Sequence, residues 1–411
     1  GGTAAFAQQN QEMSKYQGAL DGFESKVNLP DFDTVVFSRK RHAAAPLRMT
    51  FRATNRKDAE AWQKKLRAKL VELVGGFPDH APAPKAELLE KREFPNYIRE
   101  KFVFESRPGV AVLGYALIPK TPAPHAAMVC VPGHGRGVED LVGIDDKGRD
   151  RTDQDGYQHD YAIQAAEHGM AAIAIEPMGF GCRRDPAAKK KGLGTSSCQP
   201  AAGAALLLGE TMISWRVYDV MRTIDWIGTR SNFDSKRVGC MGISGGGTCT
   251  LFSAALDTRI QMAFVSGYLN TFRDSILSLS HCMDNYVPGI LNWAEQYDVA
   301  GLIAPRNVSM FMAADARPDR PPEWVERERE KGGELGPQEY PLSAEEAFVS
   351  SGNVVFDLQA LAWQRQHAVA APAWRGRMTV QNGRAKAVKG DDVWRVWEWP
   401  DPSKSYLISA D

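Results

Sequence analysis

The stretch Val238-Gly-Cys-Met-Gly-Ile-Ser-Gly-Gly-Gly247 decides how this chain is interpreted. Its first half is a short apolar run typical of a strand, and residues 246–256 after it are predicted to form a helix. A strand that turns at once into a helix holds its corner residue, here Ser244, in a strained backbone conformation. Side chains two positions before and after the corner would collide, so both positions favour glycine. The pattern predicts a nucleophile elbow, with the Ser244 hydroxyl raised at the rim of a sheet.

Short apolar runs without alternation recur along the chain, and such runs are typical of strands covered on both faces. The predicted strands are residues 126–131, 171–175, 238–241, 262–265 and 308–312, preceded by a pair at 101–105 and 111–118, and the predicted helices are 58–74, 157–168, 206–227 and 246–256. A rhythm of strand, helix and strand predicts an α/β fold with a mostly parallel central sheet and helices on both faces.

A second glycine-rich loop, Pro132-Gly-His-Gly-Arg-Gly137, follows the apolar run at 126–131. In esterases of the α/β-hydrolase fold, a His-Gly loop at this place supplies backbone N–H groups to the anion of the tetrahedral intermediate. We therefore predict an oxyanion hole made by Gly135 or Arg136 together with Gly245. A phosphate-binding loop is the alternative, but the segment lacks the Lys-Ser/Thr ending that such a loop requires.

These motifs, with Gly209-Glu-Thr-Met-Ile213, His281-Cys-Met-Asp-Asn-Tyr-Val-Pro-Gly289 and Leu302-Ile-Ala-Pro-Arg306, occur in a fixed order. These motifs and their order resemble the acetyl-xylan-esterase-like and dienelactone-hydrolase-like branch of the α/β-hydrolase superfamily, and the resemblance covers roughly residues 90–306. The resemblance implies a carboxylic ester hydrolase that acts on a small-molecule or carbohydrate ester through an acyl-enzyme on Ser244. It also implies a Ser–Asp/Glu–His triad and no cofactor.

The chain departs from this family after Arg306. The resemblance places the triad acid near Asp315, with Asp319 as the second choice. His367 is the histidine that remains downstream and it matches no family motif, while His281 is expected to hold its own loop. The sequence thus predicts a nucleophile and an anion hole without an identified base. Two hypotheses remain open, a serine esterase of impaired activity and a non-catalytic binding scaffold with the hydrolase fold.

The region after the hydrolase motifs resembles a different family. Glu339-Tyr-Pro-Leu-Ser-Ala-Glu-Glu-Ala-Phe348 is similar to the segment that joins the ATPase and nuclease parts of phage terminase large subunits, and residues 406–411 to their first nuclease strand. The phosphate loop of the ATPase is absent, so no packaging or cleavage activity is expected. We therefore expect a composite chain, produced by gene fusion or by read assembly. Its expected parts are an export-signal remnant at 1–7, an N-terminal helical extension at 8–84, a truncated hydrolase core at 85–316 and a terminase-like fragment at 317–411.

Composition limits the partners. The 50 basic residues balance 50 acidic ones, which gives no electrostatic reason to expect nucleic acid or an anionic membrane as a partner. No apolar run is long enough to predict a membrane span. No Cys/His/Asp cluster has the sequence spacing of metal ligands, so no metal is predicted.

The remaining expectations concern export and the cysteines. Ala5-Phe6-Ala7 fits the small-x-small pattern before a signal-peptidase cut, which predicts an exported, periplasmic or extracellular protein. Cys182 and Cys198 enclose a polar loop where an exported protein could place a disulfide. Three other cysteines, Cys130, Cys240 and Cys249, lie in apolar runs and are predicted to be buried thiols.

Overall fold

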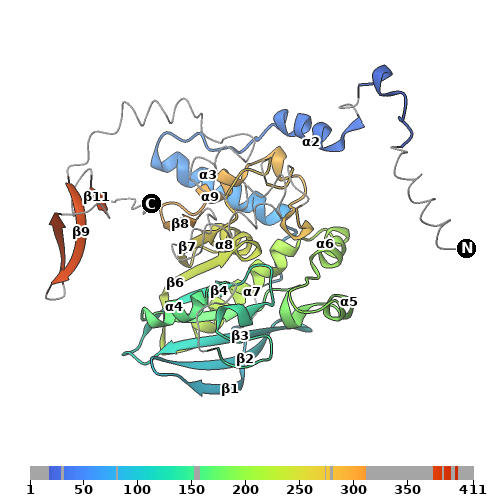
Figure 1. Cartoon of the computed structure of the whole chain (residues 1–411). Coiled ribbons are helices and arrows are strands. Elements are labelled where there is room, and N and C mark those ends of the chain that lie inside the picture. The colour runs from blue at the N-terminus through green and yellow to red at the C-terminus, as the bar shows by residue number, and fades with distance from the viewer. Residues whose placement is uncertain are drawn as a thin grey trace, which may run out of the picture. The chain divides into compact units, whose positions relative to one another are not determined.

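A computed structural model of the chain describes residues 18–28, 32–79, 82–151, 158–273, 275–277 and 281–311, and strands within 374–396 (Figure 1). The chain divides into two compact units, Gly1–Ala347 and Phe348–Asp411, which are described separately. In the second unit, three antiparallel strands pair in the order β10-β9-β11: β9 Trp374–Gln381, β10 Arg384–Lys389 and β11 Trp394–Val396. The terminase-like motifs at 339–348 and 406–411 lie outside the described residues.

The described part of the first unit contains an eight-stranded sheet in the order β1-β2-β3-β5-β4-β6-β7-β8. Its strands are β1 Glu87–Glu93, β2 Tyr97–Arg107, β3 Val110–Pro119, β4 His125–Val131, β5 Ala171–Ile175, β6 Phe233–Ile243, β7 Ile260–Ser266 and β8 Asn307–Phe311. β1, β2 and β3 pair antiparallel, as do β3 and β5, whereas β5, β4, β6, β7 and β8 run parallel. The α/β prediction is confirmed.

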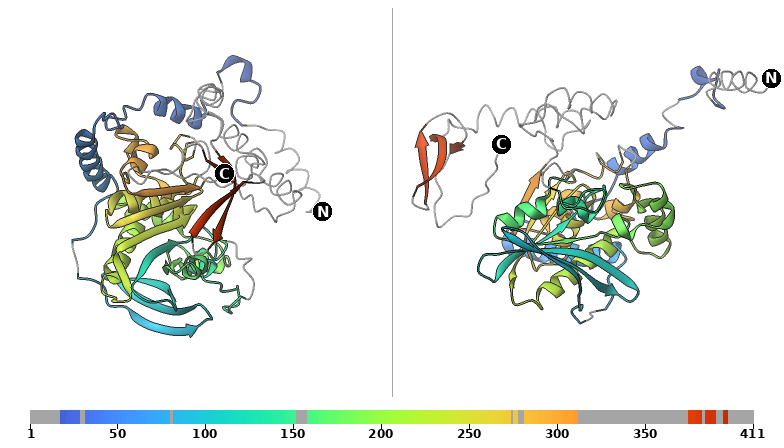
Figure 2. Two further views of the ribbon diagram at one scale, coloured as in Figure 1. Left: turned by 90° about the vertical axis from the view of Figure 1, so that its left-hand side faces the viewer. Right: turned by 60° about the horizontal axis from the view of Figure 1, so that its bottom comes forward.

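Helices cover both faces of this sheet (Figures 1 and 2). The described α-helices are α2 Thr34–Ala43, α3 Arg56–Leu73, α4 Tyr161–Glu167, α5 Pro186–Lys190, α6 Cys198–Leu207, α7 Met212–Ile227, α8 Gly245–Leu256 and α9 Gln296–Gly301, and the 3₁₀ turns are η1 Glu24–Lys26, η3 Val138–Leu141, η4 Gly181–Arg183, η5 Met283–Asn285 and η6 Ile290–Asn292. None of the described helices has the length and apolar character needed to cross a bilayer.

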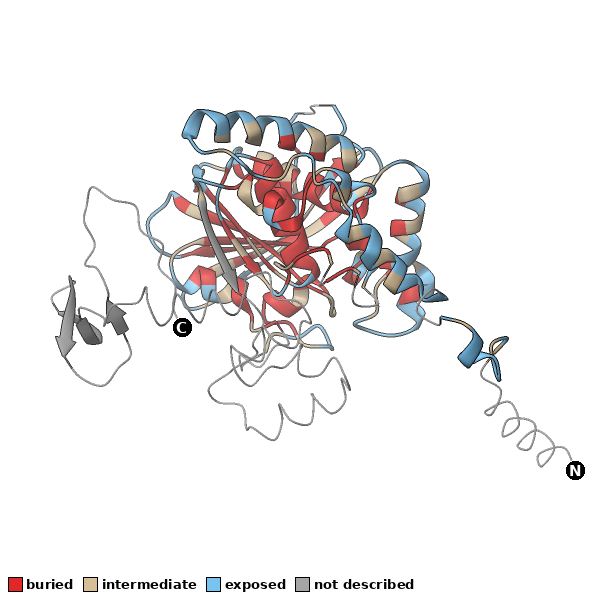
Figure 3. Ribbon diagram, turned by 90° about the horizontal axis from the view of Figure 1, so that it is seen from above, coloured by how far each residue is buried: buried red, intermediate tan, exposed pale blue. Residues whose placement is uncertain are grey.

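Two hydrophobic cores lie against the sheet, and in Figure 3 the buried residues concentrate in the strands and the helices packed on them. One core includes α3, α7 and α8, and the other includes α4 and η3. Leu66, Leu70 and Val74 of the α3 region are at most 1 % exposed within the first core. The segment predicted as an extension thus includes a helix that packs into the hydrolase core.

The prediction of one continuous helix over 206–227 is wrong. The chain breaks between α6 and α7 because Gly209 has a φ of 75°, in the left-handed region that ends helices. Thr211 then caps the new helix, since its hydroxyl accepts the Ser214 N–H at 3.0 Å. This break separates α6, which contributes to the site below, from the long core helix α7.

Candidate active site

Ser244 occupies the corner between β6 and α8. Its backbone has φ 53° and ψ −119°, a conformation that non-glycine residues adopt only at an energetic cost of about 1–3 kcal/mol. The Ser244 N–H donates to the carbonyl oxygen of Ser266 on β7 at 2.9 Å, so pairing with β7 continues to the corner. The strand, the corner and the helix lie where the sequence predicts them.

The glycines around Ser244 are explained by backbone proximity. A methyl group on Gly246 would overlap the carbonyl oxygen of Val131 on β4, and one on Gly242 would overlap the carbonyl oxygen of Gly246. A methyl group on Gly247 would lie 2.6 Å from the Ser266 carbonyl oxygen, well inside a normal contact. The corner therefore leaves no room for side chains at 242 and 246, as the elbow pattern requires.

The glycine-rich loop at residues 132–137, called the anion-binding loop below, lies directly beside this corner. A methyl group on Gly133 would be 3.1 Å from Cβ of Ser244. The loop is held in turn by the buried Gln158, whose side-chain oxygen accepts the Gly133 N–H at 2.7 Å. Gln158 has no motif around it, and the sequence analysis did not identify it.

The amides of Gly135 and Arg136, the two alternative donors from the loop, differ in the structure. The Arg136 N–H donates to Asp140 at 2.8 Å, and the Arg136 guanidinium pairs with the same carboxylate at 2.6 Å. Its amide is therefore engaged. Within the described residues, no hydrogen bond occupies the N–H of Gly135 or of Gly245, so these two amides remain the candidates for an oxyanion hole.

Glu176, which follows β5, ties this loop to the next one. Its carboxyl group is buried and accepts the Val138 N–H at 3.1 Å and the Cys182 N–H. A methyl group on either Gly137 or Gly181 would overlap this carboxyl group, so both loops wrap closely around it. Burial raises the pKa of Glu176 to about 8, although the two N–H donors oppose the shift.

The cysteines correct one expectation. Cys182 and Cys198 are both free thiols, so the disulfide that an exported protein could place between them is not formed. Cys198 instead lies 3.3 Å from Nε2 of His134, on the anion-binding loop, and donates to Asp284 at 3.1 Å. Cys130, Cys240 and Cys249 are buried free thiols, as predicted.

The rest of the triad is not assembled within the described residues. His281 lies 3.2 Å from Nδ2 of Asn285 in its own loop, as expected, and burial lowers its pKa. No hydrogen bond joins a histidine to the Ser244 hydroxyl in the described part of the chain. Asp315, Asp319 and His367 lie outside the described residues.

The structure brings together one group of possible metal ligands that the spacing in the sequence does not indicate. Ligand atoms of His134, Cys282 and Asp284 lie within 4.8 Å of one another. The Asp284 carboxylate already forms a buried ion pair with Arg216, so a cation at this place would face the guanidinium charge. We assign no metal function to this group.

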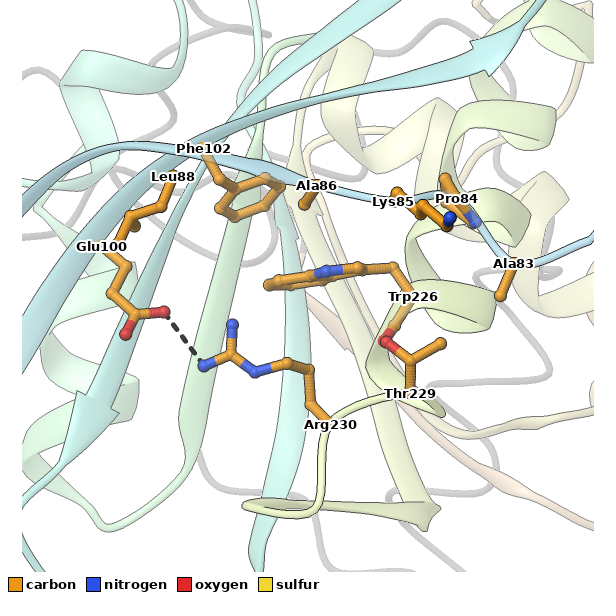
Figure 4. A pocket seen from close by; sticks show the side chains of 10 residues that line it. All are labelled: Ala83, Pro84, Lys85, Ala86, Leu88, Glu100, Phe102, Trp226, Thr229 and Arg230. Atoms are coloured by element: carbon orange, nitrogen blue, oxygen red, sulfur yellow. Dashed lines mark hydrogen bonds and ion pairs between the residues drawn. The ribbon is translucent and has the colours of Figure 1, made fainter.

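A cavity of about 510 Å³ lies at the other end of β6, near its first residues (Figure 4). Trp226 stacks on Phe102 with ring centroids 4.4 Å apart, and Arg230 pairs with Glu100 at 3.0 Å. Ser244 does not line this cavity. The hollow and the predicted chemistry therefore belong to opposite ends of one strand.

The chain is similar in sequence and in fold to known proteins. The sequence model described as the Abhydrolase family matches residues 37–282. A Bacillus subtilis (strain 168) protein named as a hydrolase, YtaP, is 26 % identical over 250 residues, which are 58 % of this chain and 77 % of that protein. A crystal structure from Bacteroides fragilis NCTC 9343, of a protein named as an acetyl xylan esterase, has a TM-score of 0.60 at 21 % identity and covers 68 % of this chain and 74 % of its own.

A glucuronoyl esterase from Solibacter usitatus is more distant, with a TM-score of 0.45 at 14 % identity, over 62 % of this chain and 75 % of its own. The family match starts at residue 37, so it includes α3, which the core packing above had already joined to the sheet. Because the family model matches more than half of the chain and the sheet has the expected topology, this protein belongs to the Abhydrolase family of α/β hydrolases.

Proposed function

We propose that this protein is a carboxylic ester hydrolase that reacts through an acyl-enzyme on Ser244. The observation that carries the proposal is the strained Ser244 corner, with the anion-binding loop packed beside it. In the first step the Ser244 oxygen bonds to the ester carbonyl carbon, and the alkoxide departs with the serine proton. Water then releases the acid and restores the hydroxyl.

The developing oxyanion is proposed to lie against the N–H groups of Gly245 and Gly135. Gly245 opens α8, and a helix N-terminus favours negative charge in its neighbourhood. Donors aimed at this position lower the barrier, and removal of one such donor typically costs about 10²–10³-fold in turnover. The engaged amide of Arg136 is left out of this assignment.

A serine hydroxyl is a poor nucleophile until a base takes its proton. We propose Asp315, shortly after β8, as the acid of the triad. His281 and His367 are the histidines that follow Ser244 in the sequence. The lack of an imidazole partner for Ser244 within the described residues favours the second candidate function, a non-catalytic hydrolase-fold scaffold that binds a ligand.

The proposed substrate is a small-molecule or carbohydrate ester. Support comes from the Bacteroides fragilis relative, which is named as an acetyl xylan esterase. An acetylated xylo-oligosaccharide is therefore the first substrate to test, with release of acetate as the measurement and a Ser244→Ala chain as the control.

Labelling of the full chain with a fluorophosphonate separates the two candidate functions. The esterase proposal expects an adduct on the peptide that contains Ser244, formed faster than on any other serine and absent from Ser244→Ala. A folded chain that acquires no adduct at Ser244 would refute the esterase proposal and favour the scaffold.

A further inference from the structure

A buried relay of polar side chains connects the anion-binding loop to the core. Sγ of Cys198 lies 3.3 Å from Nε2 of His134, 3.1 Å from Oδ2 of Asp284 and 3.5 Å from Nη2 of Arg216. Arg216 in turn pairs with Asp284 and donates to the carbonyl oxygen of Met178. Cys198, Asp284 and Arg216 are at most 3 % exposed, so these contacts form out of water.

The chemistry of the relay fixes the position of each proton. Burial raises the pKa of the Cys198 thiol to about 11, even beside Arg216, so the sulfur carries its proton at neutral pH. Burial opposes ionisation of Asp284, but the Arg216 charge and the hydrogen bonds from Cys198 and Arg216 together lower its pKa, so Asp284 accepts as a carboxylate. With its proton donated to Asp284, the sulfur has only lone pairs to offer His134.

It follows that His134 donates Nε2–H to the sulfur, since a ring nitrogen opposite an acceptor must carry the proton. In the neutral imidazole this is the Nε2–H tautomer. Its Nδ1 lone pair then lies toward the start of α8, where a methyl group on Gly245 would be 3.4 Å away. The imidazole also packs against Phe180, with ring centroids 4.6 Å apart.

His134 directly precedes Gly135, so the orientation of its side chain sets the orientation of the loop that carries the Gly135 amide. The loop is fixed on its other side by Gln158, which binds Gly133. Cys198 is thus the contact that reaches across from α6 to complete the support of this loop.

We propose, resting on the esterase function above, that the Cys198 thiol is a positioning residue that fixes the tautomer and place of His134 and thereby aims the Gly135 amide at the oxyanion. It is neither a second nucleophile nor a disulfide partner. A displacement of about 1 Å in such a donor can cost about 10²-fold in rate.

The test uses fluorophosphonate labelling of Ser244 in the full chain, with the second-order rate resolved into a binding constant and a maximal rate. Cys198→Ala is expected to lower the maximal rate about 10-fold or more with little change in binding, because the amide acts in the transition state. Cys198→Ser keeps a hydroxyl between His134 and Asp284 and should lose less. Cys240→Ala is the matched control, because Cys240 is a buried core thiol whose hydrogen bond is to the Thr250 hydroxyl at 3.5 Å, and it should label within about twofold of the parent chain.

A double-mutant cycle tests whether Cys198 acts through His134. In a His134→Ala chain, Cys198→Ala should produce no further loss of labelling rate, because the relay is already cut. The inference would be overturned if the parent, Cys198→Ser and Cys198→Ala chains labelled at equal rates. It would also be overturned if Cys240→Ala lost as much labelling rate as Cys198→Ala. Either outcome would leave the esterase function intact. If Cys198→Ala does not fold, Cys198→Ser alone and within His134→Ala decides by the same criterion.

Nitrogen-15 NMR of histidine-labelled protein gives a readout that does not depend on catalysis. The His134 ring is expected as the Nε2–H tautomer in the parent chain, and as a mixture or the other tautomer in Cys198→Ala. If Ser244 is not labelled even in the parent chain, the proposed function fails, and the NMR result alone decides the relay: an Nδ1–H tautomer in the parent chain would refute it.

Discussion

The two ends of β6 solve different physical problems. Its first residue, Phe233, packs against Trp226, which together with Phe102 of β2 lines a cavity of about 510 Å³. At its last residues, glycines bring backbone segments so close that a methyl group on Gly246 would not fit. The cavity therefore does not coincide with the chemistry proposed for Ser244. The carboxyl end of parallel strands, where backbone N–H groups converge, is the better guide.

Gly246→Ala should give the largest effect, because the added methyl group would overlap the Val131 carbonyl oxygen and backbone cannot move aside cheaply. We expect a loss of about 3 kcal/mol or more in the free energy of unfolding, measured by urea denaturation, together with loss of Ser244 labelling. Gly203→Ala is the control, since nothing lies within 4 Å of its added methyl group on α6. It should stabilise the chain by about 0.5–1 kcal/mol.

Arg216→Met should rank next, because it leaves the buried carboxylate of Asp284 without its charge partner. Removing one partner of a buried ion pair typically costs about 3–5 kcal/mol in the free energy of unfolding. Arg56→Met removes the exposed pair with Glu60 and should leave the midpoint of urea denaturation essentially unchanged. Similar losses for the two variants in urea denaturation would contradict the burial argument.

Glu176→Gln should change how stability depends on pH. The folded pKa of about 8 lies above the ordinary glutamate pKa of 4.5, so the native state holds a proton that the unfolded state has released in this window. Stability from this group is therefore complete below pH 4.5 and is lost as the pH rises to about 8.

At about 1.4 kcal/mol per pKa unit, the expected loss over that window is about 5 kcal/mol for the parent chain, and the glutamine variant should lack this component. Thermal unfolding of both chains between pH 5 and pH 8.5 measures the difference. Parallel curves for the two proteins would show that Glu176 ionises normally in the fold.

Arg230→Met should have the smallest effect and sharpens the contrast between the two ends. Its ion pair with Glu100 is partly exposed, so its loss is expected to cost at most about 1 kcal/mol. The rate of Ser244 labelling should remain that of the parent chain, because the residue lies at the opposite end of β6 from the nucleophile. A clear fall in labelling would show that the cavity in Figure 4 communicates with the corner.

The parts of the fold that sequence predicted are those with local requirements. β5 matches residues 171–175 because a continuous apolar run signals a strand buried on both faces. β1 was missed because its Glu-Leu-Leu-Glu-Lys-Arg-Glu sequence is largely charged, as an edge strand allows. The break at Gly209 was missed because apolar residues lie on both sides of it, at 206–208 and at 212–213.

By itself, the sequence determined the Ser244 corner, because strand, glycines, serine and helix are adjacent residues whose steric requirements are met within one turn. Only the tertiary structure decided what supports that corner. Cys198 is 64 positions from His134 and 86 from Asp284, so no local pattern predicts that they meet. A contact between distant segments depends on how the whole sheet and its helices pack, and it was this packing that replaced an expected disulfide with a buried hydrogen-bonded thiol.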